Sequence, residues 1–370
     1  MSKKLVIAGG GHAHMLTLAH LDEFITKGFE VTVIGPDTHH YYSGMGPGML
    51  GGTYSPGEIR FATRHLVEKK GGVFKQDKVI DIQPIEHTLK LSSGELVSYD
   101  VLSCNLGSQV PDQLIQGPLD DIFLVKPIER LYRAKKRIFE LGVQKTIKIA
   151  VVGGGPSAVE IAGNIWRLGQ KPDMHEPEIT VFAGRSLMPS HPTKVRQRAA
   201  NSLAARSIKI VKNTRIEKIK TGQLTDTNGT AHDFDIIFVA VGVKPNPIIA
   251  QSDLPTGPQG GMLVNRYLQS TKYEGIFGGG DCIDFEETPL DKVGVYAVRQ
   301  NPILKHNLMA SLTGEPLRPF EPGGQYLLIF NLGDGTGILS KWSIVLGGRL
   351  AFFLKDWIDR RFMRNFQAFE

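Results

Sequence analysis

The sequence is poor in cysteine and contains no long apolar run. Only two cysteines occur among its 370 residues, which excludes a disulfide framework and is typical of proteins from a reducing compartment. No run of about 18 or more uncharged apolar residues is present, so no transmembrane helix is predicted. The basic opening Met1–Lys4 runs into glycines at 9–11 without a small-residue cleavage site, which predicts a first β-strand instead of a signal peptide. We therefore expect a cytoplasmic protein.

The remaining composition is that of a large globular protein. With 41% hydrophobic and 22% charged residues, the chain is long enough for two or three domains with extensive cores. Its net charge of +6 accompanies no nucleic-acid recognition motif, so no binding to nucleic acid is expected. No metal site is expected either, because no third His or Cys lies at ligand spacing from His39 and His40.

The most informative stretch is the glycine turn at residues 153–155. An apolar strand, Ile147–Val152, precedes it, and a helix, Ser157–Leu168, follows it. Glycines let the backbone approach a pyrophosphate, and the free N–H groups at the start of the helix attract that anion. The pattern predicts a dinucleotide site with contacts at Gly153, Gly155, Pro156 and Ser157.

A second glycine turn, at residues 9–11, follows the first strand of the chain, Lys4–Ala8. A helix over 12–27 and a strand, Glu30–Ile34, complete a βαβ unit. His14 replaces the third glycine of the motif, and the acid that usually ends the second strand to bind the ribose is absent. Asp37, slightly further on, is the expected substitute. Two such turns predict two dinucleotides, with electrons passing from one to the other.

The segments between the two turns predict a loop, a meander and a crossover. The glycine-rich stretch 39–49 is either a solvated turn or a loop that lies over a cofactor ring. A β-meander is expected from the strands 73–81, 87–91, 96–99 and 101–106, with a tight turn at Leu106–Ser108. A helix over 126–142 then leads into the second dinucleotide unit.

Beyond the central turn the same plan is repeated. Ala183 and Arg185 follow the strand Glu178–Phe182, where NAD-binding proteins favour an acid. Arg185 therefore favours the 2′-phosphate of NADPH, unless it is merely solvated. The unit is completed by a helix over 193–207, by strands near 208–211, 216–221 and 234–241, and by Gly242. The chain returns to the first unit through strands over 261–264 and 275–281 and a helix over 293–312.

In combination these motifs resemble the flavoproteins with two dinucleotide-binding domains, the pyridine nucleotide-disulfide oxidoreductase superfamily. The resemblance covers residues 1–311 and is carried by Gly9-x-Gly11, Leu106-Gly107-Ser108, Gly153 to Glu160, Ala240-x-Gly242-x-x-Pro245-Asn246 and Gly278 to Asp281. Within the group, the chain is similar to type II NADH dehydrogenases and apoptosis-inducing-factor-like proteins. It looks most like the flavoprotein module fused ahead of some selenide, water dikinases, as a stand-alone copy, through His12–His14, Tyr42–Met45, Gly294–Gln300 and Lys355–Met363.

The resemblance implies an α/β protein with two Rossmann-like domains, arranged as in glutathione reductase, and a small C-terminal region. FAD would occupy a discontinuous domain of residues 1–117 and 262–311, and NAD(P)H a domain of residues 118–261, with the C-terminal region at 312–370. The implied FAD contacts are Gly9, Gly11, His12, Ala13, Gly107, Gly280 and Asp281, of which Asp281 would hold the ribityl chain. Gly294 and Val295, at the start of a helix, would face the edge of the flavin that becomes negative on reduction.

Glu160 has two interpretations. By resemblance it matches an acid near the nicotinamide and the flavin, which implies a proton route to a quinone. Alternatively it is a glutamate favoured by the dipole at the start of a helix. Type II dehydrogenases carry an Ala-Gln pair beside the flavin that is linked with quinone binding, and Gly294-Val295 stand at those positions. The sequence therefore indicates the flavin site more directly than the quinone site.

The two cysteines bear on an alternative function. Dithiol reductases of this group use Cys-x-x-Cys or Cys-x4-Cys spacing, whereas Cys104 and Cys282 lie far apart in the sequence. We expect both to be small core residues. The favoured function is an FAD-dependent NAD(P)H oxidoreductase that reduces a quinone. The alternatives are a sulfide- or thiol-type flavoprotein and a flavin-bearing redox sensor without enzymatic activity.

The C-terminal region predicts short strands over 326–330 and 337–339 and an amphipathic helix over 346–366. In that helix, apolar side chains recur every three or four residues, with basic ones beside them: Leu346, Leu350, Phe353, Leu354, Trp357, Ile358 and Phe362, flanked by Arg349, Lys355, Arg360 and Arg364. This pattern is typical of a helix that lies in a membrane interface. A helix packed on the flavin domain and a homodimer contact are the alternatives. We expect peripheral contact with the cytoplasmic face of a membrane.

Overall fold

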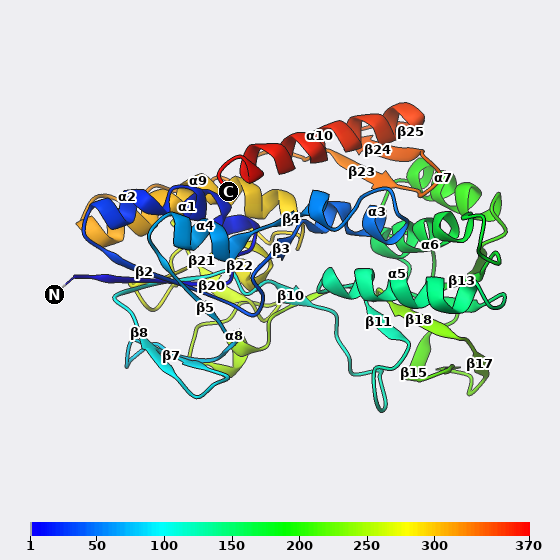
Figure 1. Ribbon diagram of the computed structural model, residues 1–370, viewed down its shortest axis with the longest axis horizontal. Helices are drawn as coiled ribbons and strands as arrows, with labels where there is room; N and C mark the ends of the chain where they lie inside the picture. Colours follow the sequence, from blue (N-terminus) through cyan, green and yellow to red (C-terminus); the bar gives the residue numbers. More distant parts are fainter. Residues whose placement is uncertain (1) are drawn as a thin grey trace.

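The computed structural model describes residues 2–370 and contains two five-stranded parallel sheets (Figure 1). The first has the order β21-β9-β1-β2-β5, with bounds Ile276–Gly278, Val101–Cys104, Lys4–Ala8, Glu30–Gly35 and Val73–Gln76. The second has the order β11-β18-β12-β13-β14, with bounds Ile122–Leu124, Ile236–Val239, Lys148–Val152, Glu178–Phe182 and Lys209–Val211. These are the two Rossmann-like sheets that the glycine turns predict.

Each sheet changes winding direction beside its central strand. The chain leaves β1 toward β2 on one side, and β9 lies on the other. In the second sheet β13 and β18 flank β12 in the same way. Ligands of open parallel sheets bind outside the carboxyl ends of the strands at such switch points. Both glycine turns lie there.

Helices cover the sheets. The first unit carries α1 Met15–Ala19, α2 Leu21–Thr26, α4 Thr63–Lys69 and α9 Gly294–Thr313, and the second carries α5 Glu129–Gly142, α6 Pro156–Gly169 and α7 Thr193–Ala204. The predicted helix over 12–27 is wrong as a single element. It is divided into the 3-10 turn His12–His14, α1 and α2, because the backbone leaves the helical region at His20 (φ −119°, ψ 31°).

The predicted four-stranded meander is also wrong in extent. Only β6 Val79–Gln83, β7 Thr88–Leu91 and β8 Leu96–Ser98 form an antiparallel sheet, whereas β5 and β9 belong to the parallel sheet. The break lies at Asp77, whose side chain accepts hydrogen bonds from the N–H groups of Lys78 and Ser93 and so turns the chain out of the parallel sheet.

The loop between β2 and β5 reaches the second unit. Its short helix α3, Gly46–Leu50, packs on α5 and α6, and the side chains of Met45, Met49 and Leu50 are buried in the second hydrophobic core. The pairs β3 His40–Tyr41 with β4 Arg60–Phe61, and β10 Ser108–Gln109 with β19 Lys244–Pro245, are antiparallel. Residues of the N-terminal segment therefore help to build the core around β12.

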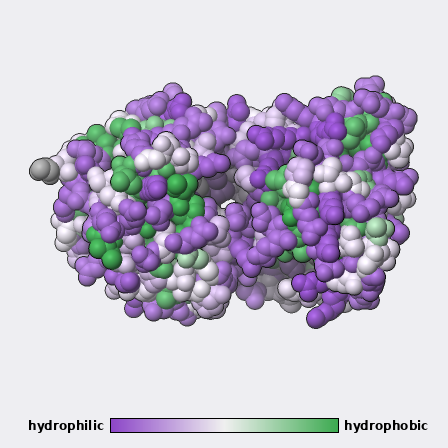
Figure 2. Space-filling model, turned by 90° about the horizontal axis from the view of Figure 1, so that it is seen from below, coloured by the Kyte–Doolittle hydropathy of each residue, from purple (hydrophilic) through white to green (hydrophobic). Residues whose placement is uncertain are grey.

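Smaller elements complete the two units. They are the antiparallel sheet of β15 Ile216–Lys220, β16 Gln223–Asp226 and β17 Ala231–Asp233, the helix α8 Ile248–Gln251, the pair β20 Met262–Val264 and β22 Ile283–Phe285, and the 3-10 turns Ser43–Met45, Gly57–Ile59 and Gly280–Cys282. Seen from below, the molecule has two lobes with a hollow between them and a largely hydrophilic surface (Figure 2).

The C-terminal region is an antiparallel hairpin sheet and one long helix. The strands are β23 Leu328–Asn331, β24 Gly337–Lys341 and β25 Ile344–Gly348, and α10 spans Arg349–Gln367. The strand β25 was not predicted. It contains Leu346, so the predicted start of the helix at residue 346 is wrong and the helix begins at Arg349. In Figure 1, α10 runs across the upper side of the molecule. It also contacts β4. No helix within residues 2–370 has the length and hydropathy needed to cross a bilayer.

Candidate functional site

A cleft of about 580 Å³ opens at the carboxyl ends of β1 and β9. Eight of the predicted FAD contacts line it: Gly9, Gly11, His12, Asp37, Gly107, Gly280, Asp281 and Gly294. The opposite wall comes from residues 126–130, with Asn246 and Ile248. Two predicted contacts, Ala13 and Val295, are not among the lining residues, and the Ala13 side chain is buried in the first core.

The glycine turn at the cleft leaves no room for side chains. Gly9 has φ +91°, and a Cβ there would lie 2.3 Å from the carbonyl oxygen of Asn105. A Cβ on Gly11 would lie 2.7 Å from Nδ2 of Asn105. Only glycine therefore fits at these two positions, and the backbone of the turn borders the cleft, as close approach to a pyrophosphate requires. The turn fits the predicted FAD site.

Two buried polar atoms at the cleft have no hydrogen-bond partner within residues 2–370. They are Nε2 of His12 and Nδ2 of Asn105. Nδ1 of His12 lies 3.2 Å from Nε2 of His40. Burial, reinforced by repulsion from His40, lowers the pKa of His12 to about 3, so the imidazole is neutral. Unsatisfied buried groups of this kind are costly, and a polar ligand in the cleft would satisfy them.

Asp281 is held by a cation that the sequence prediction missed. Lys126 donates to Oδ2 of Asp281 at 2.7 Å, and the Ser108 hydroxyl donates to the same oxygen at 2.6 Å. Burial opposes ionisation of Asp281, but Lys126 and Ser108 outweigh it and hold the carboxyl pKa below its ordinary value. The carboxylate therefore stays charged in the cleft. Lys126 is the first residue of the predicted crossover helix and lies before the observed α5, and no spacing rule singles it out.

The helix α9 begins at the rim of the cleft. Gly294 is its first residue, no side chain caps the N-terminus, and a Cβ on Gly294 would meet nothing within 4 Å. The uncapped N–H groups carry a partial positive charge, as the predicted flavin contact requires. Two buried amides fix this helix to the first glycine turn: Asn301 donates to the carbonyl of His12 at 2.8 Å, and Gln300 accepts from the N–H of Gly280 at 2.7 Å.

The second glycine turn has the same construction. Gly153 has φ +142°, and a Cβ there would lie 2.2 Å from the carbonyl oxygen of Ala240. Gly155, the N-cap of α6, and Gly242, with φ +105°, face open space. Pro156 and Ser157 open the helix, and no side chain caps it. The turn fits a second dinucleotide, and the exposed Arg185 lies beyond β13 without an ion pair among the described residues.

A buried ionic network lies behind the cleft, on the inner face of α10. Lys355 donates to Oδ2 of Asp359 at 2.6 Å and to the carbonyl of Gly44 at 2.8 Å. The Tyr42 hydroxyl donates to Oδ1 of Asp359 at 3.1 Å. Lys355 and Asp359 are only 8% and 4% exposed. Lys355, which was predicted to flank the apolar residues of the helix, is therefore buried.

Glu160 lies within the electrostatic range of this network, since the charges of Lys355 and Asp359 both affect its pKa. Its Oε1 accepts a hydrogen bond from the N–H of Asn331 at 2.7 Å. Burial raises the carboxyl pKa to about 7, although Lys355 and the N–H of Asn331 act in the opposite direction. Glu160 is therefore a group that exchanges a proton near neutral pH, at the second turn of the helix that starts at the dinucleotide turn.

Aromatic rings connect the cleft with the network. The ring of Phe362 on α10 lies 6.1 Å from that of His12 and 4.9 Å from that of Tyr42, centroid to centroid. His12 and His40 meet edge to face at 4.9 Å. The loop 39–49 is more than a solvated turn, because His39, His40, Tyr41 and Ser43 line the cleft.

Comparison with known proteins identifies the family. Residues 3–305 match the family described as pyridine nucleotide-disulphide oxidoreductase. The chain belongs to this family. It is 25% identical to ferroptosis suppressor protein 1 of Taeniopygia guttata, over 96% of this chain and 95% of that protein. It is 26% identical to the demethylphylloquinone reductase NdbB of Synechocystis sp., over 95% of this chain and 90% of that protein.

Solved structures have the same fold. NDH2 from Plasmodium falciparum in complex with NADH aligns with a TM-score of 0.81 at 14% identity, covering 100% of this chain and 98% of that one. The sulfide:quinone oxidoreductase from Aquifex aeolicus aligns with a TM-score of 0.79 at 18% identity, covering 100% of this chain and 92% of that one. The protein is thus a pyridine nucleotide-disulphide oxidoreductase family member that uses FAD and NAD(P)H.

The cysteines of this family member are not placed for thiol chemistry. Cys104 and Cys282 are fully buried, and neither lines the cleft. The Cys282 thiol donates to the carbonyl of Cys104 at 3.4 Å. Burial raises the pKa of Cys282 to about 11 and that of Cys104 well above its ordinary value, so both remain protonated. Both are core residues, as expected.

The outer face of α10 is apolar. Leu350, Phe353 and Trp357 are 84%, 68% and 47% exposed. Trp342, Ile344 and Leu346, at and before β25, are also exposed. Basic groups stand at the edge of this surface, which we call the α10 face: Arg361 lies over the ring of Trp357, and Lys341 lies over that of Trp342. Phe362, predicted on the same side, instead turns inward to the aromatic cluster.

Proposed function

We propose that this protein is an NAD(P)H:quinone oxidoreductase. Its family supplies FAD and NAD(P)H, and a relative that it matches over nearly the full length is a demethylphylloquinone reductase. The observation that carries the quinone assignment is Glu160, a carboxyl with a pKa of about 7 beside the buried pair Lys355–Asp359. A quinone that accepts two electrons also takes up two protons, so its reduction site needs a buried group that titrates near neutrality.

We assign the FAD to the cleft of the first sheet. Gly9, Gly11 and the neutral His12 would bind the pyrophosphate, and Asp37 would bind the adenosine ribose. Asp281, kept charged by Lys126, would accept hydrogen bonds from the ribityl chain, and Gly107 and Gly280 leave room for it. The start of α9 at Gly294 would place its dipole at the flavin ring. Bound there, FAD would supply the chemistry that moves a hydride from the nicotinamide and electrons to the acceptor.

We assign the nicotinamide nucleotide to the turn from Gly153 to Ser157. Gly155 caps α6 and Pro156 and Ser157 begin it, without a side-chain cap. The N–H groups of Gly155 and Ser157 are therefore available to a pyrophosphate, whereas Pro156 has no N–H and only sets the helical backbone angle. Gly242 keeps the neighbouring strand end open. Ala183 and the exposed Arg185 favour the 2′-phosphate of NADPH over the bare ribose of NADH.

The α10 face is the second part of the proposal. Its exposed apolar side chains and basic rim have the composition of a surface that binds an anionic membrane. Lys355 and Asp359 lie on the opposite, buried side of the same helix. A quinone dissolved in the membrane would therefore meet α10 first and the Glu160 network next.

Turnover with two acceptors tests this function. The FAD-loaded protein is supplied with NADPH or NADH and either a short-chain quinone or ferricyanide, which needs no proton. We expect turnover with both acceptors. A protein that reduces ferricyanide but no quinone would refute the quinone assignment and leave the family chemistry intact.

A further inference from the structure

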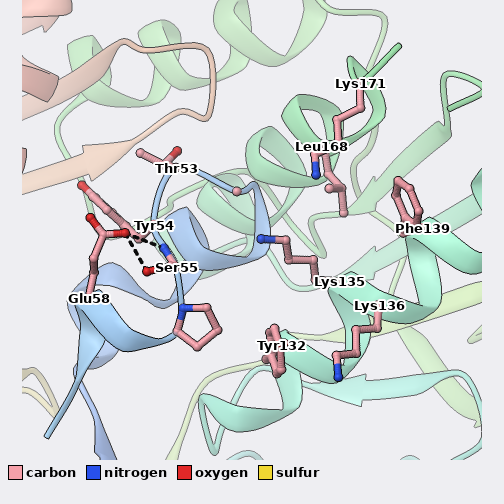
Figure 3. A pocket seen from close by; sticks show the side chains of 12 residues that line it. Thr53, Tyr54, Ser55, Glu58, Tyr132, Lys135, Lys136, Phe139, Leu168 and Lys171 are labelled. Atoms are coloured by element: carbon pink, nitrogen blue, oxygen red, sulfur yellow. Dashed lines mark hydrogen bonds between the residues drawn. The ribbon is translucent and has the colours of Figure 1, made fainter. Parts of the chain in front are cut away.

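A second cavity of about 580 Å³ lies away from both glycine turns (Figure 3). It is open to solvent and is bordered by the loop after α3, by α5 and by the C-terminal end of α6. Its lining consists of Gly52, Thr53, Tyr54, Ser55, Pro56, Glu58, Tyr132, Lys135, Lys136, Phe139, Leu168 and Lys171. Because the dinucleotide turn begins α6 and this cavity lies at its end, the two are separated by roughly 20 Å, the length of the helix.

Three lysines line this cavity, and none of them has a counter-ion within residues 2–370. Lys135 is partly buried on α5 and extends toward the loop in Figure 3, where a Cβ on Gly52 would be 3.6 Å from its Nζ. Lys171 enters from the end of α6. Within residues 2–370, Lys135, Lys136 and Lys171 form no ion pair with N···O at or below 4.0 Å.

The one acid in the lining does not neutralise them. Glu58 accepts hydrogen bonds from the N–H of Ser55 at 2.8 Å and from Arg360 at 2.7 Å. These two bonds, with Ser55 contributing most, lower the pKa of Glu58 to about 2. The charge of Glu58 is therefore already compensated by Ser55 in the loop and by Arg360 on α10. Burial, together with the positive charge of Lys171, lowers the pKa of Lys135.

Aromatic rings hold the lysines around the cavity. Nζ of Lys136 lies 4.7 Å from the centroid of the Tyr132 ring, and Nζ of Lys171 lies 5.6 Å from that of Phe139. Such contacts orient ammonium groups but leave their N–H donors unsatisfied. Thr53 adds a hydroxyl that makes no side-chain hydrogen bond among the described residues. The cavity thus presents donors and positive charge, and lacks acceptors to match them.

We propose that this cavity binds a phosphate group, with Lys135 and Lys171 as its cations and Thr53 as a further donor. A compact dianion matches the point charges of ammonium groups and accepts several hydrogen bonds at once. The volume suits a small molecule or a single headgroup. The phosphate belongs either to a soluble phosphomonoester or to the headgroup of a phospholipid.

Binding of phosphate to the FAD-loaded full chain tests the proposal. Inorganic phosphate and glycerol 3-phosphate are titrated calorimetrically in phosphate-free buffer. We expect saturable binding that weakens at least tenfold in Lys135→Met and in Lys171→Met, each of which keeps an apolar stem in place. Lys209→Met is the matched control, because it removes the same charge from an exposed position on β14 outside the cavity. Its affinity should equal that of the unaltered protein.

Vesicles distinguish the two sources. If the group comes from a lipid, vesicles containing phosphatidic acid displace glycerol 3-phosphate, whereas vesicles of equally anionic phosphatidylglycerol, a phosphodiester, do not. If the source is soluble, neither kind of vesicle displaces it. Both results support a phosphate site.

Three results would overturn the proposal. They are no saturable binding of inorganic phosphate or glycerol 3-phosphate, an unchanged affinity in Lys135→Met and Lys171→Met, and a loss of affinity in Lys209→Met as large as in those two variants. Flavin absorbance and thermal melting verify that each variant is folded. Should the Met variants not fold, protection of Lys135 from amine acylation is measured by mass spectrometry in the unaltered chain. Protection by glycerol 3-phosphate supports the site, and equal labelling with and without it contradicts the site.

Discussion

At the scale of single residues, Glu160 is the group on which the proposed chemistry depends. We expect Glu160→Gln to slow reoxidation of the flavin by a quinone about 100-fold, the usual contribution of a positioned general acid. Reduction of the flavin by NAD(P)H should change little, because hydride transfer needs no proton from this carboxyl. Stopped-flow absorbance of the two half-reactions separates these effects. Glu217→Gln, an exposed change on β15, is the control.

The pH dependence of Glu160 has a definite sign. Burial raises its pKa to about 7, so the proton-donating form disappears as the pH rises through 7. The rate of quinone reduction should therefore fall as the pH rises through 7. In Glu160→Gln this fall in rate should be absent. The raised pKa also means that the folded state binds this proton more tightly than the unfolded state. Its contribution to stability is complete below the ordinary value of 4.5 and is lost toward pH 7. Above pH 7, Glu160→Gln should therefore melt at a higher temperature than the unaltered chain.

Asp281 tests the assignment of the FAD. The substitution Asp281→Asn removes the negative charge and leaves Lys126 without its anionic partner in the cleft. Charged hydrogen bonds contribute about 1.5–3 kcal/mol, so the affinity for FAD should fall about tenfold or more. Reconstitution of the apoprotein, followed by flavin fluorescence, measures this. Equal affinity in Asp281→Asn and in the exposed control Asp120→Asn would contradict the assignment.

Arg185 tests the nucleotide preference. It is exposed beyond the end of β13, so a substitution should leave the fold intact. We expect Arg185→Met to lower kcat/KM for NADPH about tenfold, since a charged hydrogen bond to the 2′-phosphate is lost. The value for NADH should stay the same. An unchanged ratio of the two values would mean that Arg185 is merely solvated.

At the scale of elements, α10 divides its side chains between two environments. Leu350 and Phe353 are exposed, whereas Ala351 and Met363 pack inside. We expect the unaltered protein to sediment with anionic vesicles and the double change Leu350→Gln with Phe353→Gln to reduce that binding at least tenfold. Leu96→Gln, a change at an exposed apolar residue on β8, is the control. If the unaltered protein does not sediment with anionic vesicles, the proposed membrane contact of the α10 face is wrong.

The same helix shows how far a sequence pattern reaches. The spacing of its apolar residues predicts a helix and an apolar face, and both are present as α10. The pattern cannot reveal that Lys355 and Asp359 are buried, because a charged residue is normally assigned to solvent. Their burial is tolerated only because Tyr42 and Gly44 supply hydrogen bonds. The partners Tyr42 and Asp359 are 317 residues apart.

The parallel strands were the most predictable elements. Lys4–Ala8 and Glu178–Phe182 have the predicted bounds, because each is a short apolar run that ends at a turn. The break at Asp77 was not predicted, since alternation continues across it and only the side-chain bonds of Asp77 reveal the turn. Lys126 was missed for a related reason: its partner Asp281 is distant in the sequence, and only the fold brings them together.

At the scale of the whole molecule, the cleft and the network are built from both sheet units. The cleft takes Lys126 and Asn246 from the segment that surrounds the second sheet and Gly9 and Asp281 from the first. The loop that carries α3 crosses in the other direction, and α10 contacts it near Gly57–Ile59. Hydride donor, flavin and acceptor would therefore meet where the units join, and the C-terminal helix would cover the acceptor side.

One anaerobic experiment tests this account most directly. The FAD-loaded protein is titrated with NADPH while the visible flavin absorbance is followed, and one equivalent of a short-chain quinone is then added. The account predicts bleaching by the nucleotide and full recovery of the absorbance by the quinone, with recovery delayed in Glu160→Gln. Absence of bleaching by both NADPH and NADH, or a bleached flavin that ferricyanide reoxidises and a quinone does not, would contradict it.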